Sequence, residues 1–203
     1  MEDQKSQILT EAEKLFLRFG IKSVTMDYIA QNLGISKKTL YQIVDNKADL
    51  ISKIVLNHVN KETQCINQIS TEAENAISEM LNISRYNIQK LREISPVAVF
   101  EMQKYYRKSW EQIESLHREQ IYKVIFENIE KGKKEGLYRE EINSDIVAKL
   151  YVGKTFLLVD ENVFPLKQYD RRNLLMEFYL YHIHGLVTEK GRTVLNKILS
   201  ESK

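Results

Sequence analysis

The sequence predicts an all-α protein, chiefly because residues that end helices are rare in it. The 203 residues include seven glycines and two prolines, and no glycine occurs between Gly34 and Gly132. The dipeptides Asn-Gly and Asp-Gly, which favour tight turns between strands, are absent from the sequence. Helical units are short before about residue 46 and long after it. We therefore expect a small N-terminal head, residues 1–50, and a larger helical body, residues 51–203.

Composition and charge exclude several classes of protein. Hydrophobic residues make up 43% and charged residues 29%, a globular balance. No uncharged apolar run reaches the roughly 18 residues that span a bilayer, and Met1–Lys5 lacks the pattern of a secretory signal, so we expect a cytoplasmic protein without a membrane partner. The single cysteine, Cys65, excludes disulfide scaffolds and Cys-rich zinc sites. The net charge of +2 means that any contact with nucleic acid depends on where charges are placed.

The head begins with two helices that have clear boundaries in the sequence. Apolar residues at helical spacing predict a first helix over residues 5–19, and Gly20 supplies the left-handed residue that ends it. Thr25 is expected to be the N-cap of a second helix, which reaches about Leu33.

A very short turn then leads into a third helix. Gly34 and Ile35 form the turn, and Ser36 is a second N-cap. Two short helices joined in this way are typical of a helix-turn-helix unit, in which the second helix enters the DNA major groove. Lys37 and Lys38 occupy the first turn of that helix, where cations oppose the helix dipole unless the turn faces phosphates and base edges. For the two lysines alone, chance placement on the surface is the alternative.

With these features in place, residues 8–51 resemble the TetR family of bacterial transcriptional regulators. The matching stretches are ILTEAEKLFLRFG, SVTMDYIAQNLGISKKTLY and NKADLI. The resemblance implies a homodimer in which each head binds one half of a near-palindromic operator in double-stranded DNA. It also implies a C-terminal body that dimerises and binds a small-molecule effector.

The resemblance also assigns roles to particular residues of the head. It implies that the hydroxyl and amide of Thr25 hold a phosphate, that the start of the third helix addresses the groove, and that Lys47 clamps the backbone. Core packing is the alternative for Tyr41. The family usually has an aromatic residue or His and then Phe where this chain has Ile43 and Val44, so packing is expected to survive while a polar contact at position 43 is lost. The DNA-binding set is Thr25, Ser36, Lys37, Lys38, Thr39, Tyr41 and Lys47.

Two segments of the body predict a dimer interface. Residues 146–159 and 171–187 are apolar nearly all round, so each helix must be buried on more than one side. Gly153 lies inside the first segment at a cost of roughly 1 kcal/mol relative to Ala, which is tolerable where another helix approaches closely. We expect a two-fold symmetric four-helix interface. The residues assigned to it are Ile146, Leu150, Gly153, Leu157, Leu174, Phe178, Tyr181 and Gly185.

Aromatic side chains with polar tips gather between residues 100 and 122 and could line an effector cavity. The alternative is that they are ordinary core or surface residues, and they do not reveal the chemistry of a ligand. The residues assigned to the cavity are Phe100, Met102, Tyr105, Tyr106, Trp110, His117 and Tyr122.

The sequence lacks the motifs of an enzyme. HExxH, GxSxG and GxGxxG do not occur. His182 and His184, two apart on a helix, point to different faces and make a poor metal pair. We expect no catalytic residues, no metal and no cofactor, and interpret the chain as an effector-responsive regulator, a repressor rather than an activator. The alternatives are a DNA-bound accessory or chromosome-organising protein without an effector, and a helical module or enzyme whose head no longer binds DNA.

Overall fold

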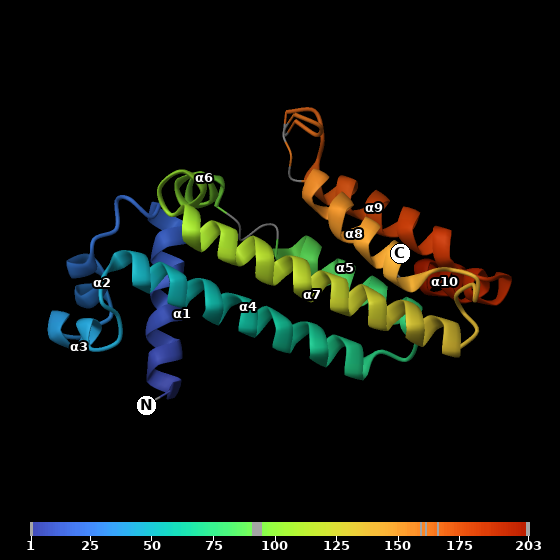
Figure 1. Ribbon diagram of the computed structural model, residues 1–203, viewed down its shortest axis with the longest axis horizontal. Helices are drawn as coiled ribbons and strands as arrows, with labels where there is room; N and C mark the ends of the chain where they lie inside the picture. The colour runs from blue at the N-terminus through green and yellow to red at the C-terminus, as the bar shows by residue number, and fades with distance from the viewer. Residues whose placement is uncertain (1, 91–94, 159, 161, 166, 202–203) are drawn as a thin grey trace. The chain divides into compact units, whose positions relative to one another are not determined.

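The computed structural model describes residues 2–90, 95–158, 160, 162–165 and 167–201, with side chains from residue 5 onward. Within these ranges the chain forms the ten α-helices of Figure 1 and no strand beyond one antiparallel bridge between Tyr138 and Val187. The all-α prediction is confirmed. None of the helices in the described ranges is long and apolar enough to cross a membrane.

The chain divides into two compact units, Met1–Gln64 with Glu93–His117, and Cys65–Arg92 with Arg118–Lys203. The first unit contains three complete helices at the N-terminus and a fourth from later in the chain, together with the first parts of two long helices. These elements are α1 (Glu2–Phe19), α2 (Met26–Asn32), α3 (Lys37–Tyr41), α6 (Pro96–Tyr105) and the beginnings of α4 (Lys47–Glu72) and α7 (Arg107–Lys134).

The helices of the head meet in a closed apolar core. Its centre is formed by side chains that are fully buried, one or two from each of the first four helices, such as Ala12, Ile29, Leu40 and Leu50. The buried residues of α1 and of α4 recur at helical spacing, so each of these helices turns an apolar face toward the core. Burial of this core fixes the short helices α2 and α3, which are too short to be stable alone.

The predicted helix ends of the head are confirmed. Thr25 Oγ1 accepts a hydrogen bond from the Tyr28 amide at 3.1 Å, and Ser36 Oγ accepts one from the Thr39 amide at 2.9 Å. Gly20 has a φ of 82°, in the left-handed region that favours glycine. The first helix begins at Glu2 rather than at residue 5, because its first turn is polar and shows no apolar periodicity.

The second unit holds the remaining helices around a core of its own. Its additional elements are α5 (Ala76–Lys90), α8 (Ser144–Leu157), α9 (Arg171–Leu186) and α10 (Glu189–Glu201), and α5 packs against both α9 and α10. Tyr138 is buried in the core, and its hydroxyl lies 3.2 Å from the Ala76 carbonyl and the Asn128 side-chain oxygen. Gly132 makes room for this ring, since a Cβ there would lie 2.1 Å from it.

Both apolar segments of the body are helical, as predicted. They correspond to α8 and α9, whose N-caps are Asn143 and Asp170. Val159, expected at the end of the first segment, lies outside the described residues. The rings of Tyr151 on α8 and Phe178 on α9 are 4.7 Å apart, so the two helices pack against each other.

Candidate nucleic-acid interface

The helix-turn-helix unit is held rigid by its turn and by buried side chains. Helix α2 ends at Asn32, α3 begins at Lys37, and the Ile35 amide donates to the Ala30 carbonyl at 3.0 Å across the turn. Figure 1 shows α2 and α3, in blue, beside α1. Leu40, on the inner side of α3, is completely buried. The orientation of α3 is therefore fixed by the core of the head.

The opposite side of α3 is polar and accessible. Ser36, Lys37 and Lys38 are exposed, and Thr39 is half-buried with its hydroxyl 2.7 Å from that of Ser36. The ring of Tyr41 is 42% exposed, so it does not fill the core. Hydroxyl and ammonium groups thus project from the helix that the sequence assigns to the DNA groove, and these are the groups that bind phosphates and base edges.

Lys37 has an acidic partner on the neighbouring helix. Its Nζ lies 2.6 Å from the carboxylate of Asp27 in the first turn of α2. The hydrogen bond and charge of Asp27 raise the pKa of Lys37. Both side chains are well exposed, so water screens the pair and it contributes little to stability. DNA phosphates would compete with Asp27 for the ammonium group.

Lys47 ties the start of α4 to the start of α2. Its Nζ donates to the Val24 carbonyl at 2.6 Å and lies 5.7 Å from the centre of the Phe16 ring. Burial lowers the pKa of Lys47, and the charge of Glu101 acts in the opposite direction. This contact places the ammonium group beside the N-terminus of α2, where Thr25 is also expected to meet a phosphate.

The turn between α3 and α4 is fastened by side chains. Asn46 caps α4 by accepting from the Asp49 amide at 3.0 Å, and Asp49 accepts from the Asp45 amide at 2.9 Å. Lys53 donates to Asp49 at 2.6 Å and to the Ile43 carbonyl at 2.8 Å. The hydrogen bond from Lys53 is the main cause that lowers the pKa of Asp49. These bonds hold α3 in place relative to the helix that follows it.

The two departures from the family pattern keep their packing. Val44 is buried in the head core, and Ile43 packs against that core from the edge. The expectation that apolar packing survives at these positions is confirmed.

Three residues near the interface did not emerge from the sequence as site residues. Tyr28 is 40% exposed on α2, with its ring edge-on to that of Phe19 at 6.1 Å. Glu101 of α6 accepts a hydrogen bond at 2.9 Å from the amide of Lys22, which lies in the turn that follows α1. The third is Asp27, which pairs with Lys37. The roles of Asp27 and Glu101 depend on contacts between different helices or turns, which periodicity within one helix does not show.

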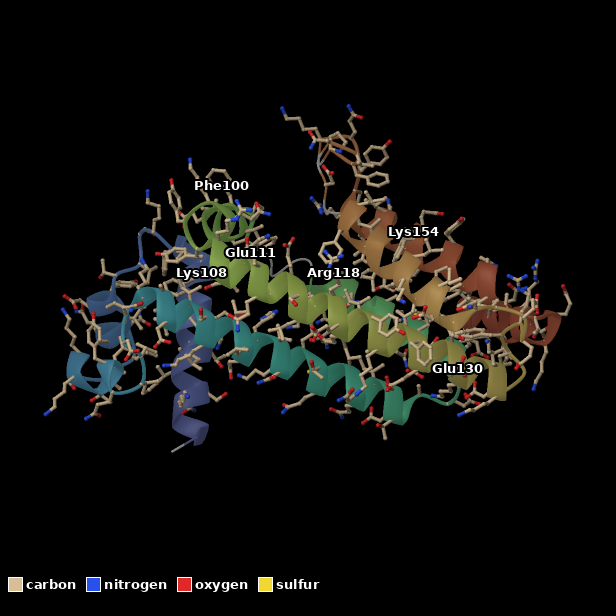
Figure 2. All side chains as sticks on the ribbon, in the orientation of Figure 1. Phe100, Lys108, Glu111, Arg118, Glu130 and Lys154 are labelled. Atoms are coloured by element: carbon tan, nitrogen blue, oxygen red, sulfur yellow. The ribbon has the colours of Figure 1, made fainter. Side chains whose placement is uncertain are left out.

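The predicted effector residues have different surroundings in the structure. Met102 and Tyr106 pack against the head core. Phe100, which Figure 2 shows on α6, is 56% exposed, and Tyr105 is 46% exposed. These four residues all belong to the first compact unit.

The other three predicted effector residues lie along α7. Trp110 and His117 are half-buried in the first unit. Tyr122 belongs to the second unit, where its hydroxyl donates to Asp145 at 2.8 Å. Two hollows on the surface of the second unit are lined by other residues, including Phe126 and Lys131.

The predicted dimer residues form two apolar stripes on the paired helices α8 and α9. On α8, Ile146, Leu150 and Leu157 are 54%, 55% and 47% exposed. Gly153 lies between them, with no atom of a neighbouring element within 4 Å of the position of a Cβ. The spacing i, i+4, i+7 and i+11 puts all four on one side of the helix.

The stripe on α9 has the same spacing but is partly covered. Tyr181 is 69% exposed and Gly185 is exposed, while Leu174 and Phe178 are half-buried. Exposed apolar groups repeated along two neighbouring helices are typical of a surface that another protein covers.

Comparisons with known proteins identify the N-terminal part of the chain as that of a bacterial regulator. Residues 8–54 match the family described as "Bacterial regulatory proteins, tetR family". The chain is 27% identical to the HTH-type transcriptional regulator YhgD of Bacillus subtilis (strain 168), over 76% of this chain and 83% of the relative. It is 29% identical to the HTH-type transcriptional activator FasR of Mycolicibacterium smegmatis, over 63% of this chain and 47% of that relative.

The fold is also similar to that of solved regulators. A putative transcriptional regulator from Saccharomonospora viridis, crystallised in complex with choline, superposes with a TM-score of 0.71. The superposition covers 93% of this chain and 100% of the other, at 16% identity. This likeness is one of fold, and it covers the helical body as well as the head.

Proposed function

Because the chain is a transcriptional regulator of the TetR family, we propose that it acts as a homodimeric repressor that a small-molecule effector releases from its operator. Residues 1–50 form the DNA-binding domain in this proposal, and residues 51–203 form the domain that dimerises and binds the effector. The observation that carries the proposal concerns α3. Its inner side is buried in the core of the head, and its outer side is polar and accessible.

The proposed contacts with DNA divide into positioning and reading. The Thr25 hydroxyl and the Lys47 ammonium group both lie at the start of α2, and in this proposal they hold a phosphate there. Ser36, Lys37 and Lys38, in the first turn of α3, address the groove, and Lys37 leaves Asp27 to do so. The hydroxyls of Thr39 and Tyr41 bind phosphates on the outer side of α3.

Dimerisation sets the distance between two such heads. We propose that the α8 and α9 stripes of two copies form a four-helix interface, in which Gly153 and Gly185 allow close approach. Half-sites on one face of DNA are about 34 Å apart per helical turn, or a multiple of this. A dimer can therefore bind both half-sites only when its heads have the matching separation.

The effector acts on this separation. Helix α4 begins at Lys47 in the head and continues into the body, so a change in its direction moves the head. Within the first unit, α6 also contacts α1, and Glu101 binds the Lys22 amide. A tenfold loss of operator affinity requires about 1.4 kcal/mol of coupling between effector and DNA.

Fluorescence anisotropy tests the proposal on the DNA upstream of the protein's own gene, across a salt series. We expect specific binding that weakens as salt rises and weakens further in the double variant Lys37→Ala/Tyr41→Phe. A transcription assay with the same DNA then fixes the sign of regulation. Fractions of a cell extract are then added to the binding assay to look for an effector. If no fraction changes operator binding, an accessory DNA-binding protein is favoured over a repressor that an effector releases.

A further inference from the structure

A cluster of metal-binding side chains lies in the first unit, away from the residues assigned to DNA. His58 and Glu62 are one turn apart on α4 and therefore share a face of that helix. His117 comes from α7. One potential ligand atom of each of the three lies within 4.8 Å of those of the other two. Neighbours on one helix and a third residue from another helix are a common way to build a metal site in a helical protein.

The contact between His117 and Glu62 is not a simple hydrogen bond. His117 Nε2 is 3.0 Å from a Glu62 carboxylate oxygen, which is close enough for an ion pair. The nitrogen is nevertheless buried and makes no hydrogen bond of normal geometry to a described residue. A buried polar atom of this kind needs an explanation, and a bound ion is one of the usual ones. The nitrogen and oxygen are also near the spacing of about 3.4 Å that two ligands of one tetrahedral zinc ion adopt.

A carboxylate outside the cluster orients His58. Its Nδ1 lies 2.6 Å from Glu13 of α1, whose side chain is 19% exposed. A carboxylate on one ring nitrogen fixes the tautomer of a ligating histidine and directs the other nitrogen to the metal. The pair therefore supplies the outer partner that metal-bound histidines in proteins almost always have.

From these contacts we infer that His58, Glu62 and His117 bind one divalent transition-metal ion of the zinc class. Two imidazoles and one carboxylate favour Zn²⁺ and its neighbours over Mg²⁺ or Ca²⁺, which prefer oxygen ligands only. Three protein ligands leave a fourth position for water or another small ligand. The side chains of His117 and Glu62 are 31% and 22% exposed, so the cluster lies near the surface of the unit rather than deep in its core.

The ion would join helices that matter for the head. His58 and Glu62 lie on the helix that begins at Lys47, and Glu13 lies on α1. A bound metal ion would link α4 to α7 through His58, Glu62 and His117, and it would stabilise the contact of His58 with Glu13 of α1. Metal binding would then change the affinity of the protein for its operator. This consequence rests on the proposed function, whereas metal binding itself does not depend on it.

Metal titration of the metal-free, full-length protein tests the site. Zn²⁺ is added in competition with a chromophoric chelator, and Co²⁺ is added separately because its visible spectrum reports the coordination geometry. We expect one ion per chain and a four-coordinate Co²⁺ spectrum. His117→Ala and Glu62→Gln should each lower the affinity by more than the roughly 10- to 100-fold that outer-shell changes cost. Glu13→Gln should lower it by about 10-fold.

Two matched variants exclude adventitious binding. His184→Ala removes an exposed histidine of α9, and Cys65→Ser removes the only thiol, which is exposed on α4. Both should bind metal as the wild type does. Circular dichroism checks that every variant is folded, and Glu62→Gln keeps the shape of the side chain in case His117→Ala unfolds.

The inference is overturned if His117→Ala and Glu62→Gln bind Zn²⁺ as tightly as the wild type, or if Cys65→Ser or His184→Ala abolishes binding. In that case the cluster is an ion pair between helices. Operator binding is measured separately, with and without Zn²⁺. A protein that binds metal but not DNA would contradict the proposed function, and the metal site would still be supported.

Discussion

The head and the α8–α9 pair use the same helical pattern but expose opposite chemistry. In the head, Leu40 points into the core and Lys38 points out. In the α8–α9 pair, the core side is filled in the same way by Ile183, yet Leu150 and Tyr181 point out. A helix with polar groups outside is complete in water, whereas a helix with apolar groups on both sides has a surface still to be buried.

This difference indicates partners of different kinds. The outer side of α3 presents ammonium and hydroxyl groups, which suit a polyanion, and the outer side of α8 presents branched apolar groups and a glycine, which suit another helix. Substitutions on α3 should therefore leave dimerisation unchanged, and substitutions in the α8 and α9 stripes should leave the DNA contacts of a single head unchanged. Only binding to a whole operator requires both surfaces.

The largest effect is expected where a charge enters the apolar stripe. We predict that Leu150→Glu converts the dimer to monomer, because each copy would bury an unpaired carboxylate, at a cost of about 3 kcal/mol or more. That corresponds to at least a roughly 100-fold rise in the dimer dissociation constant. Sedimentation velocity measures it across a concentration series.

Leu56→Glu is the matched control for this substitution, because Leu56 is a leucine of α4 that is 40% exposed and outside the stripes. It should leave the dimer unchanged. A Leu150→Glu protein that sediments as a dimer at low micromolar concentration would place the interface elsewhere.

The second-largest effect is a loss of stability in acid, which we attribute to a histidine of the body. Burial, with a smaller contribution from Lys154, lowers the pKa of His182 to about 4, and the ring of Tyr151 lies 4.6 Å away. Above pH 6.5 the imidazole is neutral in both the folded and the unfolded chain. As the pH falls below 6.5 only the unfolded chain takes up the proton, so the free energy of unfolding decreases until about pH 4.

We predict that His182 alone removes up to about 3 kcal/mol of stability between these pH values. Urea denaturation at pH 7.5 and pH 4.5 measures the loss, which should be smaller in His182→Leu. His184→Leu, two residues further along α9 and exposed, should lose as much stability as the wild type. Equal losses in His182→Leu and the wild type would show that other groups cause the acid sensitivity.

A smaller effect is expected from one lysine of the head. Lys38→Ala should weaken operator binding and reduce the slope of log affinity against log salt by about 2, because each of the two heads loses one cation that lies close to the DNA phosphates. Anisotropy titrations between 50 and 200 mM salt measure the slope. The dimer should be unaffected, and a salt slope unchanged from that of the wild type would remove Lys38 from the interface.

The smallest effect should be a gain. Asp27→Asn removes the acidic partner of Lys37 and a negative charge beside the proposed phosphate site, so affinity for DNA should rise a few-fold. The gain should appear for specific and random DNA alike and should be smaller in a Lys37→Ala background, where only the loss of the negative charge acts. A loss of affinity in Asp27→Asn would mean that the ion pair positions Lys37 for DNA.

The sequence was most informative where chemistry is local. Thr25 and Ser36 each cap a helix by bonding an amide three residues later, so their roles can be read from neighbouring residues. The helical nature of α8 and α9 followed from long apolar runs. The first turn of α1 escaped detection, because polar residues show no periodicity.

Contacts between distant segments could not be predicted. The three groups of the proposed metal site come from two helices, and the third has no fixed spacing from the first two. The aromatic residues between 100 and 122 were grouped by proximity in sequence, yet Phe100 faces solvent, Met102 packs on the head core and Tyr122 belongs to the other unit. A cavity is lined by whichever helices the fold brings together, so the assignment of an effector site to these residues stays a prediction.

The central claim, that the head reads DNA as one half of a dimer, is tested most directly by selection of fragmented genomic DNA with the full-length protein. The wild type should enrich near-palindromic sites whose half-sites are spaced by about one helical turn or a multiple of it. Lys37→Ala/Tyr41→Phe should enrich them far less. If the wild type enriched no sequence over this variant, or only sites without two-fold symmetry, the account would be contradicted.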